Sequence, residues 1–340
     1  DYGSKARDGY HDRAREAADL YRYVEDMSDQ DIAMLARKDG LDVAIDLKGY
    51  TENGRAGIFA ARAAPVQISF LGYPGTLGLP QMDYIVADPT VVPPELQTAY
   101  CEQVLYMPHC YQVNDRDRLD GDTSLPPTRA EVGLPEEAFV FCSFNNTYKI
   151  TPREFDIWMR LLRNVPGSVL WCFAGQEGSE ANLLAEAEQR GVDSSRIIFA
   201  RRVSHKEHMA RHKLADLFLD TFIVNAHTTA SDALLAGVPV VTKLGLQFAA
   251  RVCGSILINV GLEDLVADTE ENYETIALHL AKNPQVLTEV RNRLKSGLAH
   301  GPLFDSAQFT KDFEVGLELV VQRSREGKPP KHIRIPEPEL

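Results

Sequence analysis

A histidine, two threonines and an aspartate lie close together in the segment H-T-T-A-S-D at residues 227–232, after an apolar run at 214–221. Hydroxyls and unpaired N–H groups at a helix start donate to an anion, and the helix dipole favours negative charge there. Asp232 follows the threonines by three and four residues, so it projects from the same helix face. A carboxylate at this position suits ribose hydroxyls. A threonine N-cap with an acidic first turn is the structural alternative.

A lysine follows the first apolar run of the second half of the chain, in the segment F-N-N-T-Y-K-I at 144–150. The ammonium of Lys149 is a compact counter-charge for phosphate, and it would stabilise a departing diphosphate. The asparagines before it are common turn formers, and a solvated surface lysine is the alternative for Lys149.

Three histidines and an arginine recur at helical spacing in the segment H-K-E-H-M-A-R-H at 205–212. His205, His208 and Arg211 or His212 share one face of the expected helix. A zinc site needs a further carboxylate or thiolate set and an open coordination position, which this pattern does not supply. The segment therefore favours a hydrogen-bonding rim over a nucleotide, with a solvated helix face as the alternative.

The elements that must position these residues form an alternation of short apolar runs and helical segments, typical of doubly wound parallel sheets. Ligands of such sheets bind beyond the carboxyl ends of the strands. The expected strands are residues 43–47, 66–71, 84–88, 104–107, 138–144, 169–173, 197–200, 214–220 and 238–242, and the expected helices of the second half are 153–164, 180–189, 205–212 and 228–236.

A polar stretch at residues 114–131 divides the chain and is predicted to be the interdomain linker. The charged opening has no strand before it, so the first Rossmann-like domain is expected to be incomplete at its N-terminus. The expected organisation is a partial N-terminal domain at 1–113, a nucleotide-sugar-binding domain at 132–305, a helix at 306–327 and a disordered, proline-rich tail at 328–340.

Composition limits the partners of the chain. A net charge of −13 over 340 residues argues against nucleic acid or an anionic membrane as the main partner. No apolar run approaches the roughly 18 residues of a membrane span. Five cysteines without a C-x-x-C pair indicate neither a disulfide framework nor a zinc site, and reduced thiols favour a cytoplasmic location.

An ordered set of motifs resembles the catalytic region of the protein O-GlcNAc transferase and SPINDLY family. The resemblance implies two Rossmann-like domains of the glycosyltransferase B type, a UDP-sugar held mainly by the second, protein acceptors, and no metal or other cofactor. The motifs are G-Y-T at 49–51, L-G-Y-P-G-T at 71–76, M-D-Y at 82–84, M-P-H at 107–109, F-N-N-T-Y-K-I at 144–150, V-P-G-S-V-L-W at 165–171, A-D-L-F-L-D-T at 215–221 and H-T-T-A-S-D at 227–232.

The resemblance also assigns residues. Lys149 matches the family's catalytic, diphosphate-binding lysine, and Asp232 matches its ribose-binding carboxylate. His205 stands where animal members have a lysine. The remaining matches are Asn146, His208 and Arg211 near the nucleotide, His227, Thr228 and Thr229 at the diphosphate, and Leu71, Gly72 and Pro74 in the loop lining the sugar and acceptor.

The sequence departs from the family pattern in the segments it lacks and in the length of its linker. The D-x-x-x-H-P segment, whose histidine has been proposed as a base, and the tetratricopeptide array are expected upstream of Asp1 in the full-length protein. The short linker favours a bacterial-type member. The expected reaction is inverting transfer of N-acetylglucosamine from UDP-GlcNAc to Ser or Thr of proteins. O-fucosyl transfer from GDP-fucose, use of UDP-glucose, and nucleotide binding without turnover are the alternatives.

Overall fold

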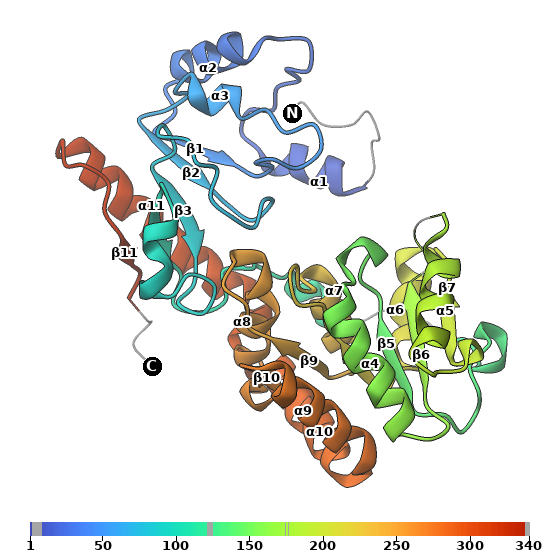
Figure 1. The fold of residues 1–340 in the computed structure, drawn as a ribbon. Helices are drawn as coiled ribbons and strands as arrows, with labels where there is room; N and C mark the ends of the chain where they lie inside the picture. Colours follow the sequence, from blue (N-terminus) through green and yellow to red (C-terminus); the bar gives the residue numbers. More distant parts are fainter. Residues whose placement is uncertain (2–8, 121–124, 174, 176, 337–340) are drawn as a thin grey trace. The chain divides into compact units, whose positions relative to one another are not determined.

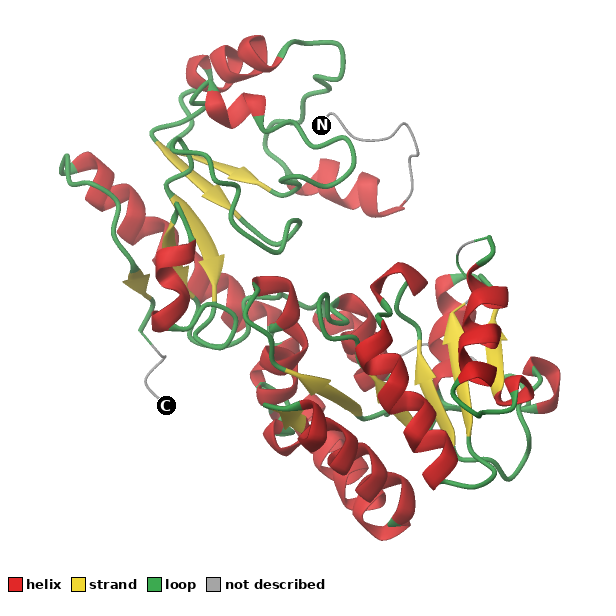
Figure 2. Cartoon of the chain, in the orientation of Figure 1, coloured by secondary structure: helices red, strands yellow, loops and turns green. Residues whose placement is uncertain are grey.

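The computed structural model describes residues 1, 9–120, 125–173, 175 and 177–336 (Figure 1). The chain divides into two compact units, each described here by itself. The first contains Asp1–Val86, Glu95–Tyr106 and Glu314–Pro336, and the described part of the second contains Ala87–Pro94 and Met107–Phe313. Figure 2 shows that each unit combines strands with covering helices. Both sheets are parallel wherever pairing is assigned, so the expected α/β class is confirmed.

The first unit has a five-stranded sheet in the order β1-β2-β3-β4-β11. Every residue of β2 and β3 is buried; β3 is accordingly a continuous apolar run, whereas β2 also buries the polar Gln67 and Ser69. The strands are β1 Val43–Asp46, β2 Val66–Ser69, β3 Tyr84–Ala87, β4 Gln103–Tyr106 and β11 Ile333–Arg334, and the helices are α1 Gly9–Ala17, α2 Asp29–Lys38 and α3 Gly57–Ala60.

The second unit has a six-stranded sheet in the order β10-β9-β8-β5-β6-β7. The chain runs outward from β5 through β6 to β7, then returns to the other side of β5 and runs through β8 and β9 to β10. The strand order therefore reverses between β5 and β8. The strands are β5 Val140–Ser143, β6 Val169–Phe173, β7 Ile197–Ala200, β8 Leu217–Leu219, β9 Val240–Lys243 and β10 Val266–Ala267.

This reversal is the topological switch point, where doubly wound folds bind their ligands at the carboxyl ends of the strands. The loops after β5 and β8 flank it, and they carry Lys149 and the 227–232 segment, respectively. The helices of this unit are α4 Pro152–Asn164, α5 Ser179–Gln189, α6 His205–His212, α7 Thr228–Leu235, α8 Val252–Ile258, α9 Glu270–Lys282 and α10 Pro284–His300, and α11 Ser306–Arg325 begins in it.

Helix α4 illustrates how local sequence fixes an element. Thr151 and Glu154 form a capping box and Pro152 occupies the first turn, where its missing N–H costs nothing. The buried face carries Trp158, whose Nε1 donates to the Tyr273 hydroxyl on α9 at 3.1 Å. That hydroxyl donates to the Asp220 carbonyl oxygen at 3.0 Å, so the packing of two helices supports the loop after β8.

Two domain predictions need correction. Residues 114–131 do not join the units, because the chain passes from the first unit to the second at Tyr106 and Met107 and the described part of 114–131 lies inside the second. Proline-rich composition wrongly indicated disorder over 328–336. There, β11 pairs with β4, and Ile335 is buried. Residues 337–340 of the expected tail lie outside the described residues.

The tail is attached by side chains as well as by strand pairing. His332 Nδ1 accepts a hydrogen bond from the backbone N–H of Val104 at 2.9 Å, and the guanidinium of Arg334 lies 4.6 Å from the ring centroid of Tyr106. A two-residue strand is too short to give a hydrophobic alternation that sequence reasoning could detect.

None of the described helices has the length and apolar character needed to cross a membrane.

Candidate functional site

Asn145 ties the two loops at the switch point together. Its Nδ2 donates to Asp220 Oδ1 at 3.2 Å and to Thr221 Oγ1 at 3.0 Å, and its Oδ1 accepts from the Thr229 hydroxyl at 3.2 Å. The side chain is buried. Sequence reasoning chose its neighbour Asn146 instead, which is exposed and whose Nδ2 lies 3.5 Å from the Tyr148 hydroxyl.

Lys149 lies in this junction, at the end of the short 3-10 turn Thr147–Lys149. Its Nζ donates to the carbonyl oxygen of Asn225 at 3.0 Å. Asn225 lies two residues before His227, the N-cap residue of α7. Burial lowers the pKa of the lysine, and the negative charge of Asp220 opposes that shift. A partly desolvated ammonium interacts more strongly with an anion than a fully solvated one does.

The start of α7 is open to a ligand. The structure gives His227 as the N-cap, with no side-chain cap hydrogen bond, so the threonines are the first helical residues and the capping alternative is wrong. Thr228 is exposed and Thr229 is half-buried. The backbone N–H groups of Thr228 and Thr229 precede the first bond of this turn, which runs from the N–H of Ala230 to the His227 carbonyl oxygen at 3.0 Å.

His227 is held against the loop before α8. Its Nε2 lies 3.1 Å from the Ala249 carbonyl oxygen, which accepts only, so Nε2 carries the proton. Burial lowers the pKa of this histidine to about 4. The imidazole is therefore neutral at pH 7, and its Nδ1 is an acceptor unless a second proton arrives.

Asp232 is 5% exposed and forms an ion pair with Arg118, from the 3-10 turn Arg116–Asp120. The carboxylate predicted to bind ribose is therefore already occupied by a guanidinium. Sequence reasoning placed Arg118 in a linker and missed it, because the partners are separated by 114 residues.

The predicted rim on α6 is a packed cluster. Arg211 donates through Nε to His208 Nδ1 at 3.0 Å, and its guanidinium lies 5.3 Å from the ring centroid of Phe144. Burial lowers the pKa of His208 to about 3 and that of His212 to about 4, so both rings are neutral at pH 7. The cluster adjoins β5 through Phe144, which brings it beside the switch point.

Asp220 is a further buried group at this point that the sequence pattern did not single out. Its Oδ2 accepts from the Thr242 hydroxyl at 2.6 Å, and its Oδ1 accepts from the backbone N–H of Ala226 at 2.6 Å. Burial raises the pKa of this carboxyl to about 6, against the lowering effect of those hydrogen bonds. The only signal was its place at the end of an apolar strand.

The remaining predicted residues form none of the hydrogen bonds that join the loops of the junction. His205 is exposed at the first position of α6, after the capping box of Ser204 and Glu207. Leu71, Gly72 and Pro74 belong to the first unit. A Cβ on Gly72 would lie 1.8 Å from the Leu47 carbonyl oxygen, so only glycine fits there.

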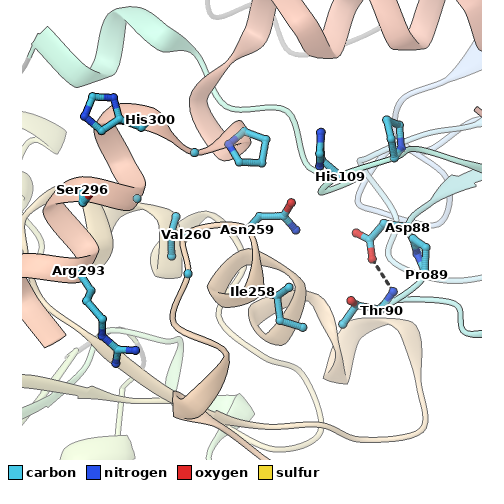
Figure 3. Close-up of a pocket in the computed structure, with 15 residues that line it drawn as sticks. Asp88, Pro89, Thr90, His109, Ile258, Asn259, Val260, Arg293, Ser296 and His300 are labelled. Atoms are coloured by element: carbon cyan, nitrogen blue, oxygen red, sulfur yellow. Dashed lines mark hydrogen bonds between the residues drawn. The ribbon is translucent and has the colours of Figure 1, made fainter. Parts of the chain in front are cut away.

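A pocket of about 660 Å³ lies elsewhere in the second unit (Figure 3). None of the predicted site residues lines it; its walls include His109, Asn259, Arg293 and His300. Asp88 also lines it, but its Oδ1 accepts from the N–H groups of Thr90 and Val91 and its Oδ2 accepts from Ser255. Both carboxylate oxygens of Asp88 are therefore already used in hydrogen bonds within the protein.

Within the described ranges, no three or more His, Cys, Asp or Glu side chains are grouped so as to hold a metal ion. Two histidine nitrogens of α6 have other contacts: His208 Nδ1 accepts from Arg211, and His212 Nδ1 lies 2.7 Å from the His208 carbonyl oxygen.

Sequence relatives are long proteins. The chain is 35% identical, over its whole length, to the "Probable UDP-N-acetylglucosamine--peptide N-acetylglucosaminyltransferase SEC" of Arabidopsis thaliana. It is 32% identical, over 96% of its length, to a similarly named SPINDLY protein of Eustoma exaltatum subsp. russellianum. It spans about a third of each relative, 35% in both cases.

A solved structure agrees with these relatives. A mutant O-GlcNAc transferase of Thermobaculum terrenum superimposes with a TM-score of 0.83 at 30% identity, covering 94% of this chain and 60% of that one. The model of glycosyl transferase family 41 matches residues 3–123 and 121–313. The fold is thus the expected pair of Rossmann-like units of the glycosyltransferase B type, and the chain belongs to glycosyl transferase family 41.

Proposed function

We propose that the full-length protein transfers N-acetylglucosamine from UDP-GlcNAc to Ser or Thr hydroxyls of proteins, with inversion at the anomeric carbon. The observation that carries this proposal is the junction at the switch point. There, the Nζ of Lys149 and the uncapped start of α7 are tied together through Asn225 and Asn145. The printed names of the relatives supply the donor and the acceptor class.

The junction suits a diphosphate leaving group. In the proposed reaction, the acceptor oxygen attacks the anomeric carbon from the face opposite the diphosphate. The bond from that carbon to the diphosphate oxygen breaks, and its electron pair leaves with UDP. Lys149 and the first-turn N–H groups of α7 stabilise the negative charge that develops there. We propose that this charge stabilisation needs no metal ion.

The other residues of the junction bind the nucleoside. In the α6 cluster, the half-buried, neutral ring of His208 beside Arg211 offers a hydrogen-bonding group to the base. Asp232 accepts from the ribose hydroxyls once Arg118 has moved away from it. The acceptor hydroxyl loses its proton to a general base as its oxygen attacks.

A donor panel tests the proposal. UDP-GlcNAc, UDP-glucose and GDP-fucose are incubated separately with the full-length protein and a Ser- and Thr-rich peptide library, and the products are identified by mass. We expect N-acetylhexosamine on peptides and release of UDP. A preference for GDP-fucose would show that the donor assignment is wrong.

Fucosyl transfer is the second candidate because the resemblance includes the SPINDLY family. SPINDLY proteins of several plants, whose names give N-acetylglucosamine transfer, match this chain at 31–32% identity. The histidine and aspartate at positions 227 and 232 favour UDP, since the SPINDLY pattern lacks them. A chain that binds UDP without turnover would show thermal stabilisation by UDP and no glycosylated product.

A further inference from the structure

A second pocket, of about 730 Å³, lies on the side of the second unit formed by α6, the end of α7 and α10. It takes His205, the one residue predicted to bind the UDP-sugar that lines it, and Lys206, Met209 and Lys213 from α6 and the segment that follows it. His208 and Arg211 of the same helix belong to the cluster at Phe144. Leu235, Ala236 and Gly237 come from the carboxyl end of α7. The pocket is therefore separate from the start of α7, where the diphosphate is proposed to bind.

The charge of this pocket opposes that of the whole chain. Arg118, Lys206, Lys213, Arg291 and Lys295 line it, and no Asp or Glu among the described residues does. The chain as a whole carries a net charge of −13, so this concentration of cations requires a local reason.

Internal ion pairs account for only part of the positive charge. Arg118 pairs with Asp232, and Arg291 lies 3.1 Å from a carboxylate oxygen of Asp216. Lys213 and Lys295 are exposed and form no ion pair with any described residue. The carboxyl end of α7 presents the equivalent of roughly half a negative charge, which is less than these two lysines supply.

Besides His205 and Asn292, the remaining wall is apolar. Leu294 is fully buried, and Met209, Leu235 and Leu298 are half-buried around it. A volume of several hundred cubic ångströms with apolar walls and a few polar groups is typical of small-molecule sites. A free inorganic anion would satisfy the lysines but would leave this apolar surface uncovered.

We propose that the pocket binds a small amphipathic anion, in which a carboxylate, sulfonate or phosphate is attached to an apolar group. The charged end lies against Lys213 and Lys295, and the apolar end covers Met209 and Leu298. This assignment depends only on the pocket and not on the proposed transfer reaction.

The pocket is linked to the nucleotide site by one side chain. Arg118 lines the pocket and pairs with Asp232. An anion in the pocket competes for the guanidinium and frees the carboxylate to accept from ribose. The two ligands then strengthen each other's binding by the same factor, as linkage requires. This second step depends on the proposed role of Asp232.

Fluorescence of 1-anilinonaphthalene-8-sulfonate tests the pocket, because this probe joins an apolar ring system to one anionic group. We expect saturable binding to the full chain that weakens with salt, and weaker binding of the uncharged N-phenyl-1-naphthylamine. The double variant Lys213→Gln/Lys295→Gln should weaken sulfonate binding at least about tenfold, since both charge-assisted contacts are lost.

Lys282→Gln/Lys311→Gln is the matched control, because both lysines are exposed and lie outside the pocket. It should bind the probe as the parent does. Equal binding by the two double variants, or equal binding of the charged and uncharged probes, would overturn the pocket assignment.

Calorimetry tests the coupling. UDP affinity is measured with and without saturating sulfonate, and it should rise by the same factor as sulfonate affinity rises with UDP. Arg118→Gln should abolish that rise. Sulfonate binding without any UDP binding would contradict the proposed function while supporting the pocket. Binding of both ligands without coupling would contradict the role of Arg118.

Discussion

The Nζ of Lys149 donates to the carbonyl oxygen of Asn225 at 3.0 Å, joining the loop after β5 to the segment that leads into α7. The two residues are 76 positions apart in the sequence. Their contact exists because β5 and β8 are neighbours in the sheet, although β6 and β7 lie between them in the chain. The reversal of strand order therefore places a cation beside an uncapped helix start.

Lys149→Met should reduce the turnover of UDP-GlcNAc by the full-length protein by about 10²- to 10³-fold, the usual effect of removing one group that stabilises transition-state charge. Nucleotide binding should weaken much less, because the first turn of α7 remains. Steady-state kinetics and UDP calorimetry measure the two effects. Lys282→Met is the control, since Lys282 is exposed at the end of α9. Unchanged turnover in Lys149→Met would falsify the catalytic role.

The backbone elements that carry this site were predictable from the sequence because they have local sequence patterns. Strands of a buried parallel sheet are apolar runs, so β5 and β8 and the helices after them were predictable, and with them the positions of Lys149 and Thr228. The side-chain network was not predictable. Asn145, Asp220 and Arg118 act through partners that are 75, 22 and 114 residues away, and no local pattern reports such pairings.

Asn145→Ala should destabilise the protein by roughly 2–3 kcal/mol, because it leaves buried partners on Asp220 and Thr221 without their hydrogen bonds. Denaturant unfolding measures this loss. The adjacent Asn146→Ala is a matched control, since that side chain is exposed, and its effect should stay within about 0.5 kcal/mol. Equal stability of the two variants would mean that Asn145 does not hold the loops together.

Stability should fall as the pH decreases from about 6.5 towards 4. Burial lowers the pKa of His208 to about 3 and those of His212 and His227 to about 4, so the native protein excludes protons that the unfolded chain binds below its own pKa near 6.5. Each of these histidines then lowers the free energy of unfolding by up to about 1.4 kcal/mol for each pH unit of acidification. Asp220 acts in the opposite direction, because burial raises its pKa to about 6 and the native state takes up a proton first.

Burial also raises the pKa of the Asp88 and Glu154 carboxyls, so three carboxyls oppose the three histidines. Burial lowers the pKa of His332, and hydrogen bonds lower the pKa of the Glu131, Asp193, Glu207, Asp268 and Glu326 carboxyls, so more groups lose stability on acidification than gain it and the net effect remains destabilising. Urea unfolding at a series of pH values gives the slope, which reports the difference in bound protons. His212→Gln should reduce that slope by about one proton, whereas His279→Gln, a change at an exposed position of α9, should leave it as it was. A stability that does not change between pH 6.5 and 5 would contradict the neutral state of these rings.

Arg118→Gln should have opposite effects on stability and on nucleotide binding. Asp232 is 5% exposed, so loss of its partner leaves a buried carboxylate uncompensated and costs about 1–3 kcal/mol of stability. The same change removes the competitor for that carboxylate. An ion pair worth about 1 kcal/mol reduces apparent nucleotide affinity roughly fivefold, so UDP should bind about that much more tightly to the variant.

Calorimetry with UDP and 2′-deoxy-UDP separates this effect from a general change in the site. Only a nucleotide with both ribose hydroxyls should gain the full increase, because the freed carboxylate accepts from them. Arg116→Gln is the control, since Arg116 is exposed and its closest acidic partner, Asp305, lies 3.8 Å away. Weaker UDP binding to Arg118→Gln would mean that the guanidinium binds the nucleotide itself, so the ion pair with Asp232 would be part of the bound site and not a competitor for it.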